Sequence, residues 1–273
     1  MLDSRRQYCS SAAFATLLSL AATQRTSPFT DPATGIVFQQ FFGARTNFAF
    51  GVALPETPST DFIGQLSFPL VQGAGWGGFS LTGDLEGPLL MAAWSDGTNV
   101  VSSFRQAFNE DDNPPEVTGN FSLRPIAEGT SVSDTFLTFT FLCEGCLSDG
   151  LGLGAADTAG VAEMGWALSS IPVIDPETPA GVLDFHDSGF GDFDADLEGA
   201  RNAEFEAWAA LAGDAAPSGA GAVPIDLRAG GDDGDDSGDD RDDRDDSDDR
   251  DDGDDRDDRD DRDDSGNESD GDD

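Results

Sequence analysis

The sequence predicts an all-β protein, an antiparallel β-sandwich with one short helix near its C-terminal end, followed by an acidic tail. Between residues 29 and 212, short runs rich in Phe, Val, Leu and Thr are separated by clusters of Gly, Pro, Asn and Asp. Several runs alternate apolar and polar residues, as residues 135–142 (TFLTFTFL) do, which is typical of strands with one buried face. Residues 231–273 contain no Phe, Trp, Leu, Ile or Val, so they have nothing to bury.

The apolar runs predict nine strands in two layers. Twenty Phe and four Trp, almost all before residue 210, supply the core between them. A helix is expected over residues 198–211, with Gly213 as its stop signal. The expected strands cover residues 36–42, 46–54, 61–71, 78–81, 88–94, 100–105, 116–124, 135–143 and 160–168.

The composition divides the chain into four parts. Residues 1–24 have the layout of a secretory signal peptide, with two arginines followed by a weakly apolar run, although a disordered extension is the alternative. Residues 25–213 form the predicted domain, and residues 214–230, rich in Ala, Gly, Pro and Ser, are expected to be a flexible linker. Residues 231–273 form the predicted disordered tail. We therefore expect a secreted, extracellular protein with no membrane-spanning segment.

The charge is strongly negative. The formal net charge is −41, the chain contains no Lys, and residues 231–273 alone hold 25 Asp, one Glu and six Arg, a net −20. Such a surface repels phosphate backbones and anionic lipids, which excludes nucleic-acid and membrane-surface binding. The tail is either a neutral Asp-rich expansion or a solubilising, tethering or weakly divalent-cation-binding segment.

Two cysteines, Cys143 and Cys146, remain once a signal peptide is removed with Cys9. Their spacing admits a zinc half-site, a redox pair, a haem-attachment motif or a structural disulfide. A zinc site would need two more soft ligands, which the sequence does not supply. Covalent haem attachment needs a histidine where Leu147 stands, so a structural disulfide is favoured. A sequon at Asn120, and another at Asn267, are compatible with export.

Two other motifs carry little. The run 73–78 (GAGWGG) resembles a dinucleotide-binding loop, but a strand-like segment follows it where that loop requires a helix, so a β-turn is expected. Asp192, Asp194 and Asp196 have the alternate spacing of a calcium loop, whose required Gly and Glu are missing. Surface acidity is the simpler interpretation.

His186 is the single histidine of the chain. One imidazole with no activated-serine motif does not suit hydrolysis, and a lone histidine is most often a surface residue. Its neighbours are unusual, because aromatic residues and glycines crowd the run 183–193 (LDFHDSGFGDF). Such a setting suits a ligand beneath a flat apolar cofactor. We predict no catalytic activity of the chain's own.

Taken in order, these segments resemble the haem b cytochrome domain of fungal cellobiose dehydrogenases and related secreted cytochrome-domain proteins. The likeness spans residues 29–212, and His186 falls where the family has its axial histidine. The matching segments are residues 29–35, 61–64, 89–97, 100–105, 141–146 and 164–168.

The resemblance implies an immunoglobulin-like sandwich that binds haem b through Met and His, with Cys143 and Cys146 as the family disulfide. It further implies single-electron transfer from a flavin dehydrogenase, here a separate protein, to a polysaccharide monooxygenase or another acceptor. Thioether–imidazole ligation suits that role because it raises the reduction potential.

One position departs from the family. Leu85 stands where the family has its axial Met, and leucine cannot donate to iron. Three alternatives remain: haem held by His186 alone, recruitment of Met91 as the second ligand, or no haem. The other function considered is a degenerate, haem-free sandwich that acts as a cell-surface or carbohydrate-binding module.

Overall fold

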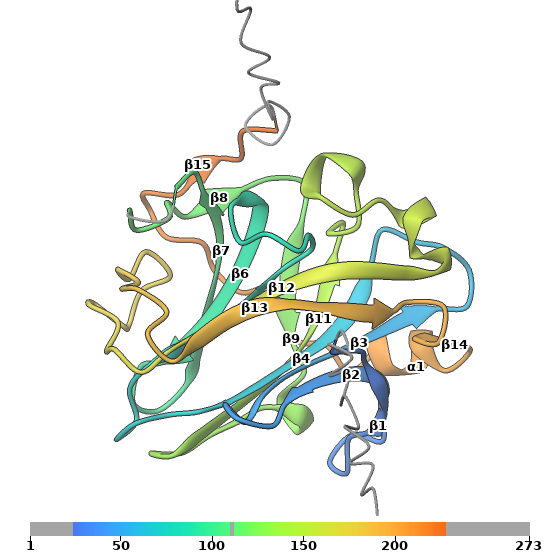
Figure 1. Cartoon of the computed structure of the whole chain (residues 1–273), viewed down its shortest axis with the longest axis horizontal. Coiled ribbons are helices and arrows are strands. Elements are labelled where there is room, and N and C mark those ends of the chain that lie inside the picture. The colour runs from blue at the N-terminus through green and yellow to red at the C-terminus, as the bar shows by residue number, and fades with distance from the viewer. Residues whose placement is uncertain (1–23, 110–111, 228–273) are drawn as a thin grey trace, which may run out of the picture. The chain divides into compact units, whose positions relative to one another are not determined.

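The structure, a computed structural model, describes residues 24–109 and 112–227 (Figure 1). The chain divides into two units, residues 1–232 and 233–273, and the β-sheets belong to the first. The expected signal peptide up to residue 23, the acidic tail and the sequon at Asn267 lie outside the described residues.

The larger sheet contains eight strands. Its main path runs β1-β2-β3-β4-β11-β10 with antiparallel neighbours, while β9 pairs with β11 and β14 pairs in parallel with β3. Its strands are β1 Ser27–Thr30, β2 Val37–Gly43, β3 Phe48–Pro55, β4 Phe62–Pro69, β9 Ser122–Pro125, β10 Ser131–Val132, β11 Phe136–Glu144 and β14 Arg201–Asn202.

The smaller sheet contains five antiparallel strands in the order β13-β12-β5-β6-β7. Its β12 and β13 are joined by residues 170–188, which we name the His186 connection. The strands are β5 Trp76–Ser80, β6 Gly87–Ser95, β7 Val100–Ala107, β12 Val161–Ser169 and β13 Gly189–Asp196.

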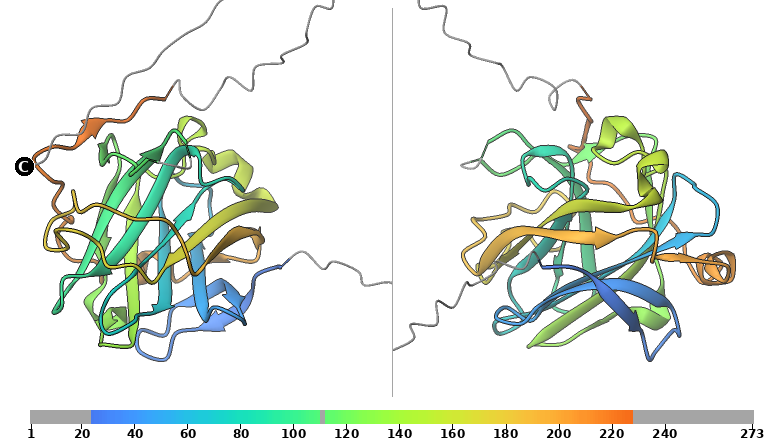
Figure 2. Two further views of the ribbon diagram at one scale, coloured as in Figure 1. Left: turned by 60° about the vertical axis from the view of Figure 1, so that its left-hand side comes forward. Right: turned by 45° about the vertical axis from the view of Figure 1, so that its right-hand side comes forward.

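Figure 2 shows the two layers from two sides. Aromatic side chains fill the space between these layers. Phe50 of β3 stacks on Phe79 of β5 with ring centroids 3.9 Å apart, and Phe41 of β2 stacks on Phe193 of β13 at 4.5 Å. All four rings are at most 2% exposed. Burial of one such ring stabilises the fold by about 1.5–3 kcal/mol, so these contacts hold the sheets together and confirm the predicted sandwich.

The predicted helix is much shorter than expected. The helix α1 spans only Phe205–Ala209, because the preceding residues join the larger sheet as β14. The Arg201 guanidinium donates to the carbonyl oxygens of Pro55 and Thr158 at 3.1 and 3.0 Å, which holds this segment extended. Short 3-10 turns complete the described helical residues: η1 Ala127–Gly129, η2 Asp149–Leu151 and η3 Ala155–Ala159.

Residues 213–226 lie along the domain, and we name them the strap. Residues 214–226 of the strap fall in the segment 214–230 that the composition predicts to be a flexible linker. Ala216 N donates to Leu123 O at 2.7 Å, and β15 Val223–Pro224 pairs in parallel with β8 Val117–Thr118. Figure 2 shows the strap in orange beside the green strands of one sheet edge. Main-chain hydrogen bonds need no apolar side chains, so the amino-acid composition of this segment does not indicate them.

Candidate cofactor-binding face

The His186 connection is bound to the smaller sheet just before the histidine. Trp76 Nε1 on β5 donates to the carbonyl oxygen of Asp184 at 2.9 Å, and Ser169 Oγ at the end of β12 donates to that of Phe185 at 2.7 Å. Each bond is worth about 1 kcal/mol net. Together they fix the two residues that precede His186.

Asp187 fixes the other side of the histidine. Its carboxylate accepts from Ser170 N and Ser170 Oγ, both at 2.7 Å, and Ser169 Oγ lies 3.3 Å from Oδ1. The bonds from Ser170 N and Ser170 Oγ lower the pKa of Asp187 below its ordinary value. The ionised carboxylate is therefore the form that holds the connection against the end of β12.

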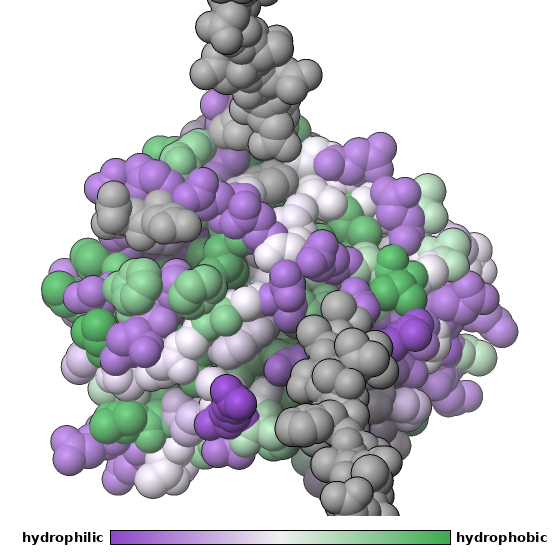
Figure 3. Space-filling model, viewed as in Figure 1, coloured by the Kyte–Doolittle hydropathy of each residue, from purple (hydrophilic) through white to green (hydrophobic). Residues whose placement is uncertain are grey.

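His186 itself is half-buried between two phenylalanines. Its ring centroid lies 4.3 Å from that of Phe185 and 4.5 Å from that of Phe190, and its Nδ1 is buried. The two phenylalanines are 55% and 61% exposed. Figure 3 shows apolar side chains at the end of the domain where the connection lies. An imidazole framed by exposed aromatic rings has the chemistry of an axial ligand beside a flat apolar group.

The first half of the connection is held by a buried arginine. Arg105 on β7 is 1% exposed, and its Nη2 donates to the carbonyl oxygens of Pro179 and Gly181 at 2.6 and 2.7 Å. Trp94 Nε1 donates to Pro176 O at 2.8 Å, and the Arg105 guanidinium lies over the Trp94 ring. Burial lowers the pKa of Arg105 to about 10, so it stays charged at neutral pH.

A row of small residues crosses the outer face of the sheet beneath the connection. Ala167, Gly78 and Ala92 are direct neighbours across β12, β5 and β6. Ala92 and Ala167 belong to an apolar cluster with Trp76, Trp94, Val173 and Leu183. Leu85, in the turn between β5 and β6, packs against the same cluster. The structure thus brings Leu85 and the His186 connection to one face.

Met91 lies on the opposite face of the same sheet. It is 1% exposed, neighbours Phe79 and Phe104 in the ladder, and belongs to the core between the layers. Alternation along β6 explains this, since Met91 and Ala92 point to opposite sides. The structure therefore does not bring Met91 together with His186, and Met164 is buried in the same core.

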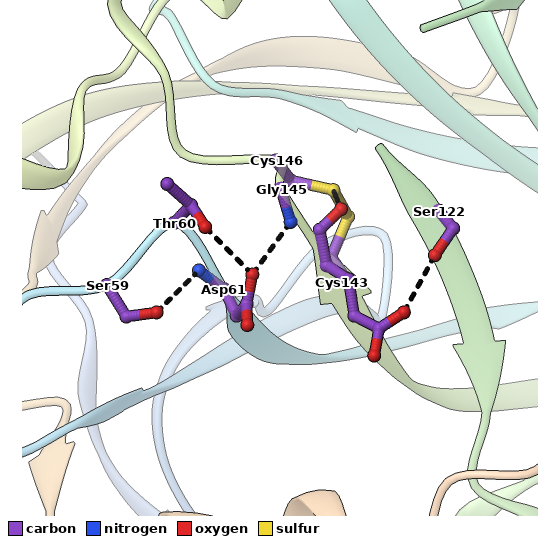
Figure 4. The surroundings of a disulfide bond; sticks show 8 residues. Ser59, Thr60, Asp61, Ser122, Cys143, Gly145 and Cys146 are labelled. Carbon is purple, nitrogen blue, oxygen red and sulfur yellow. Dashed lines mark hydrogen bonds between the residues drawn. A yellow bond between two sulfur atoms is a disulfide. The ribbon is translucent and has the colours of Figure 1, made fainter. Parts of the chain in front are cut away.

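The predicted disulfide is confirmed. Cys143 at the end of β11 bonds to Cys146 with the sulfur atoms 2.01 Å apart, and both residues are buried (Figure 4). Asp61 accepts a hydrogen bond from Gly145 N at 2.7 Å, which ties this turn to the start of β4. Gly145 has a φ of 69°, a conformation that glycine adopts without strain. The disulfide is structural and lies between the two layers.

A comparison with protein families decides the relationship. Residues 29–207 match the model of the cytochrome domain of cellobiose dehydrogenase. This chain belongs to that family. The match ends within α1, so it covers both sheets and the His186 connection.

Individual relatives agree with this assignment of the cytochrome domain. A pyrroloquinoline quinone-dependent pyranose dehydrogenase of Coprinopsis cinerea is 28% identical over 220 residues, which are 78% of this chain and 30% of that protein. The chain thus spans about a third of that relative's length. The cytochrome domain of Myriococcum thermophilum cellobiose dehydrogenase has a TM-score of 0.64 at 29% sequence identity. The aligned region covers 72% of this chain and all of that domain.

The cytochrome b domain of the Coprinopsis cinerea pyranose dehydrogenase has a TM-score of 0.61 at 24% identity, covering 71% of this chain and all of its own. Both of these solved domains have the same fold as the chain.

His186 is the side chain of this face that would hold a haem iron. His186 supplies the imidazole, and no thioether reaches this face within residues 24–109 and 112–227, because both methionines there point into the core. Leu85 supplies no donor atom. Ala92 and Ala167 are fully buried, so a porphyrin reaches the small-residue row only if Leu85 or the connection moves outward.

The three aspartates that have calcium-loop spacing lie in a strand. Asp192, Asp194 and Asp196 lie on β13 rather than in a calcium-binding loop, and Glu163 stands beside them on β12. A hydrogen bond with Asp192 and the charges of Asp192 and Asp194 raise the pKa of Glu163. Among the residues that the structure describes, no three His, Cys, Asp or Glu side chains are grouped as metal ligands.

The glycine-rich run also behaves as a turn. Val71 bridges to Ala74, Gly73 and Gly75 have φ values of 78° and 117°, and β5 follows without a helix. This confirms the expected β-turn, with a strand after it. No described helix is long and apolar enough to span a membrane.

Several residues that position His186 were missed from the sequence. Ser169, Asp187, Trp76 and Arg105 all act through main-chain groups of the connection. Such bonds depend on which strand lies beneath a loop, and they leave no motif in the sequence. The run of Ser169 and Ser170 directly after a predicted strand is the one visible hint.

Proposed function

We propose that this domain binds haem b through His186 and serves as an extracellular electron-transfer module. The observation that carries the proposal is the position of the single histidine: half-buried between two exposed phenylalanines and fixed on both sides by the sheet. Membership in the cytochrome-domain family supports it. Bound haem supplies a one-electron iron couple, which no side chain of the chain offers.

The chain's own residues position the ligand and exclude water. Ser169 and Trp76 hold the carbonyls that precede His186, and Asp187 holds the main chain that follows it. Phe185 and Phe190 provide apolar surface on either side of the imidazole. Rigid placement of the ring would keep the imidazole in the same orientation in both redox states of a bound haem, which favours rapid electron transfer.

Charge supports a role with a separate partner. The body of the chain carries roughly half of the net −41, and described basic side chains are few and mostly bonded within the domain. A redox partner with a basic docking patch would be steered to such a surface, with an association rate that falls as salt rises. We assign a flavin dehydrogenase as donor and a polysaccharide monooxygenase as acceptor. The disulfide agrees with an oxidising, extracellular location.

A second function is favoured by one observation. Ala92 and Ala167 are fully buried beneath the cluster that includes Leu85 and Leu183, so the face is closed as it stands. A haem-free sandwich that binds another molecule is consistent with this closed face. The two functions differ in whether haem enters.

The test is an absorption spectrum of the purified full chain after haem addition, oxidised and reduced. The proposal expects a Soret band in the wild type that His186→Ala loses. Phe42→Ala, which removes a 56% exposed ring on the other sheet, is the matched control and should retain the band. An absent band in the wild type, with the fold intact by circular dichroism, would establish the haem-free alternative.

A further inference from the structure

A cavity of about 210 Å³ lies under the strap, at the outer edge of β7. Its lining comes from β7, from residues 116–123 and from strap residues 216–218. None of these residues belongs to β5, β12, β13 or the His186 connection, so the cavity is separate from the candidate haem face. Nothing in the electron-transfer role uses it.

The lining of the cavity is unusually polar for a sandwich interior. Ser102 and Ser103 are 9% and 5% exposed, and Thr118 and Ser122 add two more hydroxyls. β7 is the last strand of its sheet, and next to the cavity it is bridged to Glu116 and covered by β8, β9 and the strap. The serine and threonine hydroxyls of this wall can donate and accept hydrogen bonds with a bound molecule.

Glu116 is the charged residue of the cavity wall. It is 7% exposed, and its Oε1 accepts a hydrogen bond from Gly219 N of the strap at 2.8 Å. Its Oε2 is buried and has no hydrogen-bond partner among the described residues. A buried carboxylate oxygen left without a donor costs about 1–3 kcal/mol or more. This oxygen lies against Gly219 of the strap, so a ligand hydroxyl reaches it, and recovers part of that cost, once the strap moves outward.

The charge balance of the cavity favours a neutral ligand. Arg105 is bridged to Glu116, and the Glu116 charge offsets part of the lowering of the Arg105 pKa by burial, so this cation already compensates the carboxylate. A second cation would be repelled by Arg105, and an anion would be repelled by Glu116. Binding energy must then come from hydroxyl hydrogen bonds and apolar contact.

The size and shape of the cavity narrow the class of ligand further. A volume of 210 Å³ equals that of roughly seven water molecules, well below the space that drug-sized ligands need. Phe104 and Phe121 form an edge-to-face pair in the wall, with centroids 4.7 Å apart, and offer an apolar surface. We propose that this cavity binds one neutral polyhydroxylated ring, such as a single sugar unit.

The strap provides the entrance. Ala216 N and Gly219 N bond to Leu123 O and Glu116 Oε1, whereas Pro217 and Ser218 between them roof the cavity. Gly119, Pro217 and Ser218 of the lining are exposed, so the cavity already opens to solvent beside this short, small-residue crossing. Opening it requires the loss of few bonds, and the anchors at residues 223–226 stay in place.

Ring-matched probes test the proposal with the full-length chain. Glucose, glucosamine and glucuronate present the same ring as a neutral, cationic and anionic molecule, and saturation-transfer NMR with titration reports their binding. We expect glucose to bind and glucuronate not to bind. Glu116→Gln should weaken glucose roughly tenfold, because a charge-assisted hydrogen bond is replaced by a neutral one.

Ala216→Leu separates binding from folding. Ala216 lines the cavity, so three added carbons enter existing space and should leave the melting temperature unchanged or higher while abolishing glucose binding. Phe42→Ala is the control and should bind as the wild type does. Glucose binding that survives Ala216→Leu, binding of glucosamine in place of glucose, or no binding of any probe would each overturn the proposal.

Discussion

The hydroxyl of Ser169 donates a hydrogen bond to the carbonyl oxygen of Phe185 at 2.7 Å, which ties the residue before His186 to the end of β12. The same hydroxyl lies 3.3 Å from the carboxylate of Asp187 on the other side of the histidine. One serine on the sheet thus contacts both neighbours of the single imidazole. The end of β12 therefore holds the residues on both sides of His186.

Ser169→Ala should loosen the histidine without unfolding the domain. We expect stability to fall by about 1 kcal/mol, the usual net value of one hydrogen bond, and haem affinity to fall more than stability. Urea unfolding and haem titration of the same samples separate the two effects. Ser67→Ala, on the other sheet, is the control. Unchanged haem affinity in Ser169→Ala would show that the connection needs no such anchor.

The Asp187 carboxylate predicts a pH dependence. Its pKa is lowered in the folded chain by the Ser170 bonds, so its stabilising contribution is present above the unfolded pKa near 4. That contribution is lost as the pH falls through the lower folded pKa. Asp187→Asn should therefore be less stable than the wild type at pH 7, and the difference should shrink toward about pH 2. Unfolding curves across this range check it, and a constant difference at all pH values would contradict it.

Leu85→Met tests the geometry of the second axial position. Leu85 packs against the cluster beneath the connection, so a thioether there reaches the same face as His186. We expect the haem-loaded variant to shift from a high-spin to a six-coordinate low-spin spectrum, with a raised reduction potential. Met91→Leu should leave the wild-type spectrum unchanged, because Met91 points into the core. A spectrum altered by Met91→Leu alone would assign the ligand to Met91 instead.

The disulfide should stabilise the sandwich moderately. It closes a loop only three residues in sequence separation, for which chain entropy gives roughly 2 kcal/mol. The double variant Cys143→Ala/Cys146→Ala should lose about this amount in urea unfolding, with an unchanged denaturant slope. Because neither sulfur contacts the His186 connection, haem binding should be unaffected. A loss of haem binding with full stability would contradict a purely structural disulfide.

Two truncations test the strap. Removal of residues 228–273 should leave stability within about 0.5 kcal/mol, since the acidic repeats have no apolar surface to dock. Removal of residues 214–273 additionally deletes the strap, including the bonds of Ala216 and Val223 and the reciprocal pair between Gln106 and Asp226. We expect that truncation to cost at least ~2 kcal/mol. Equal melting temperatures for the two truncations would show that the strap does not stabilise the domain.

The strands were the most predictable part of the molecule. Alternating runs such as residues 135–142 predicted β11 to within a residue, because burial of one face imposes a period of two. β13 was missed, although Phe193 and Ala195 alternate with aspartates in the same way. Its carboxylates indicate an acidic surface, and the glycines at its start hide the strand.

The strap and the shortened helix could not be predicted for a different reason. Residues 198–202 have helical spacing, but Arg201 pairs with β3 instead of joining a helix. The extended conformation is favoured because the Arg201 guanidinium donates to the carbonyl oxygens of Pro55 and Thr158. The strap is held through its main chain, and Glu116 accepts one of these hydrogen bonds, from Gly219 N. Neither partner is close in sequence, so local composition carried no signal of either contact.

The candidate site was predicted only at its centre. His186 was singled out from its aromatic neighbours, and the structure places Phe185 and Phe190 against its ring. Met91 is a candidate second ligand from sequence, but the pleat of β6 directs its side chain into the core. The anchors of the connection followed only from the pairing of β12 with β5 and β13.

Ligation of iron by His186 can be measured directly, because the chain contains one histidine. Labelling with ¹⁵N-histidine therefore marks a single imidazole, and pulsed electron paramagnetic resonance of the haem-loaded ferric chain reports whether that nitrogen is bound to iron. The account predicts a strong ¹⁵N hyperfine coupling, unchanged in Phe42→Ala. A haem-loaded chain with no such coupling would contradict it.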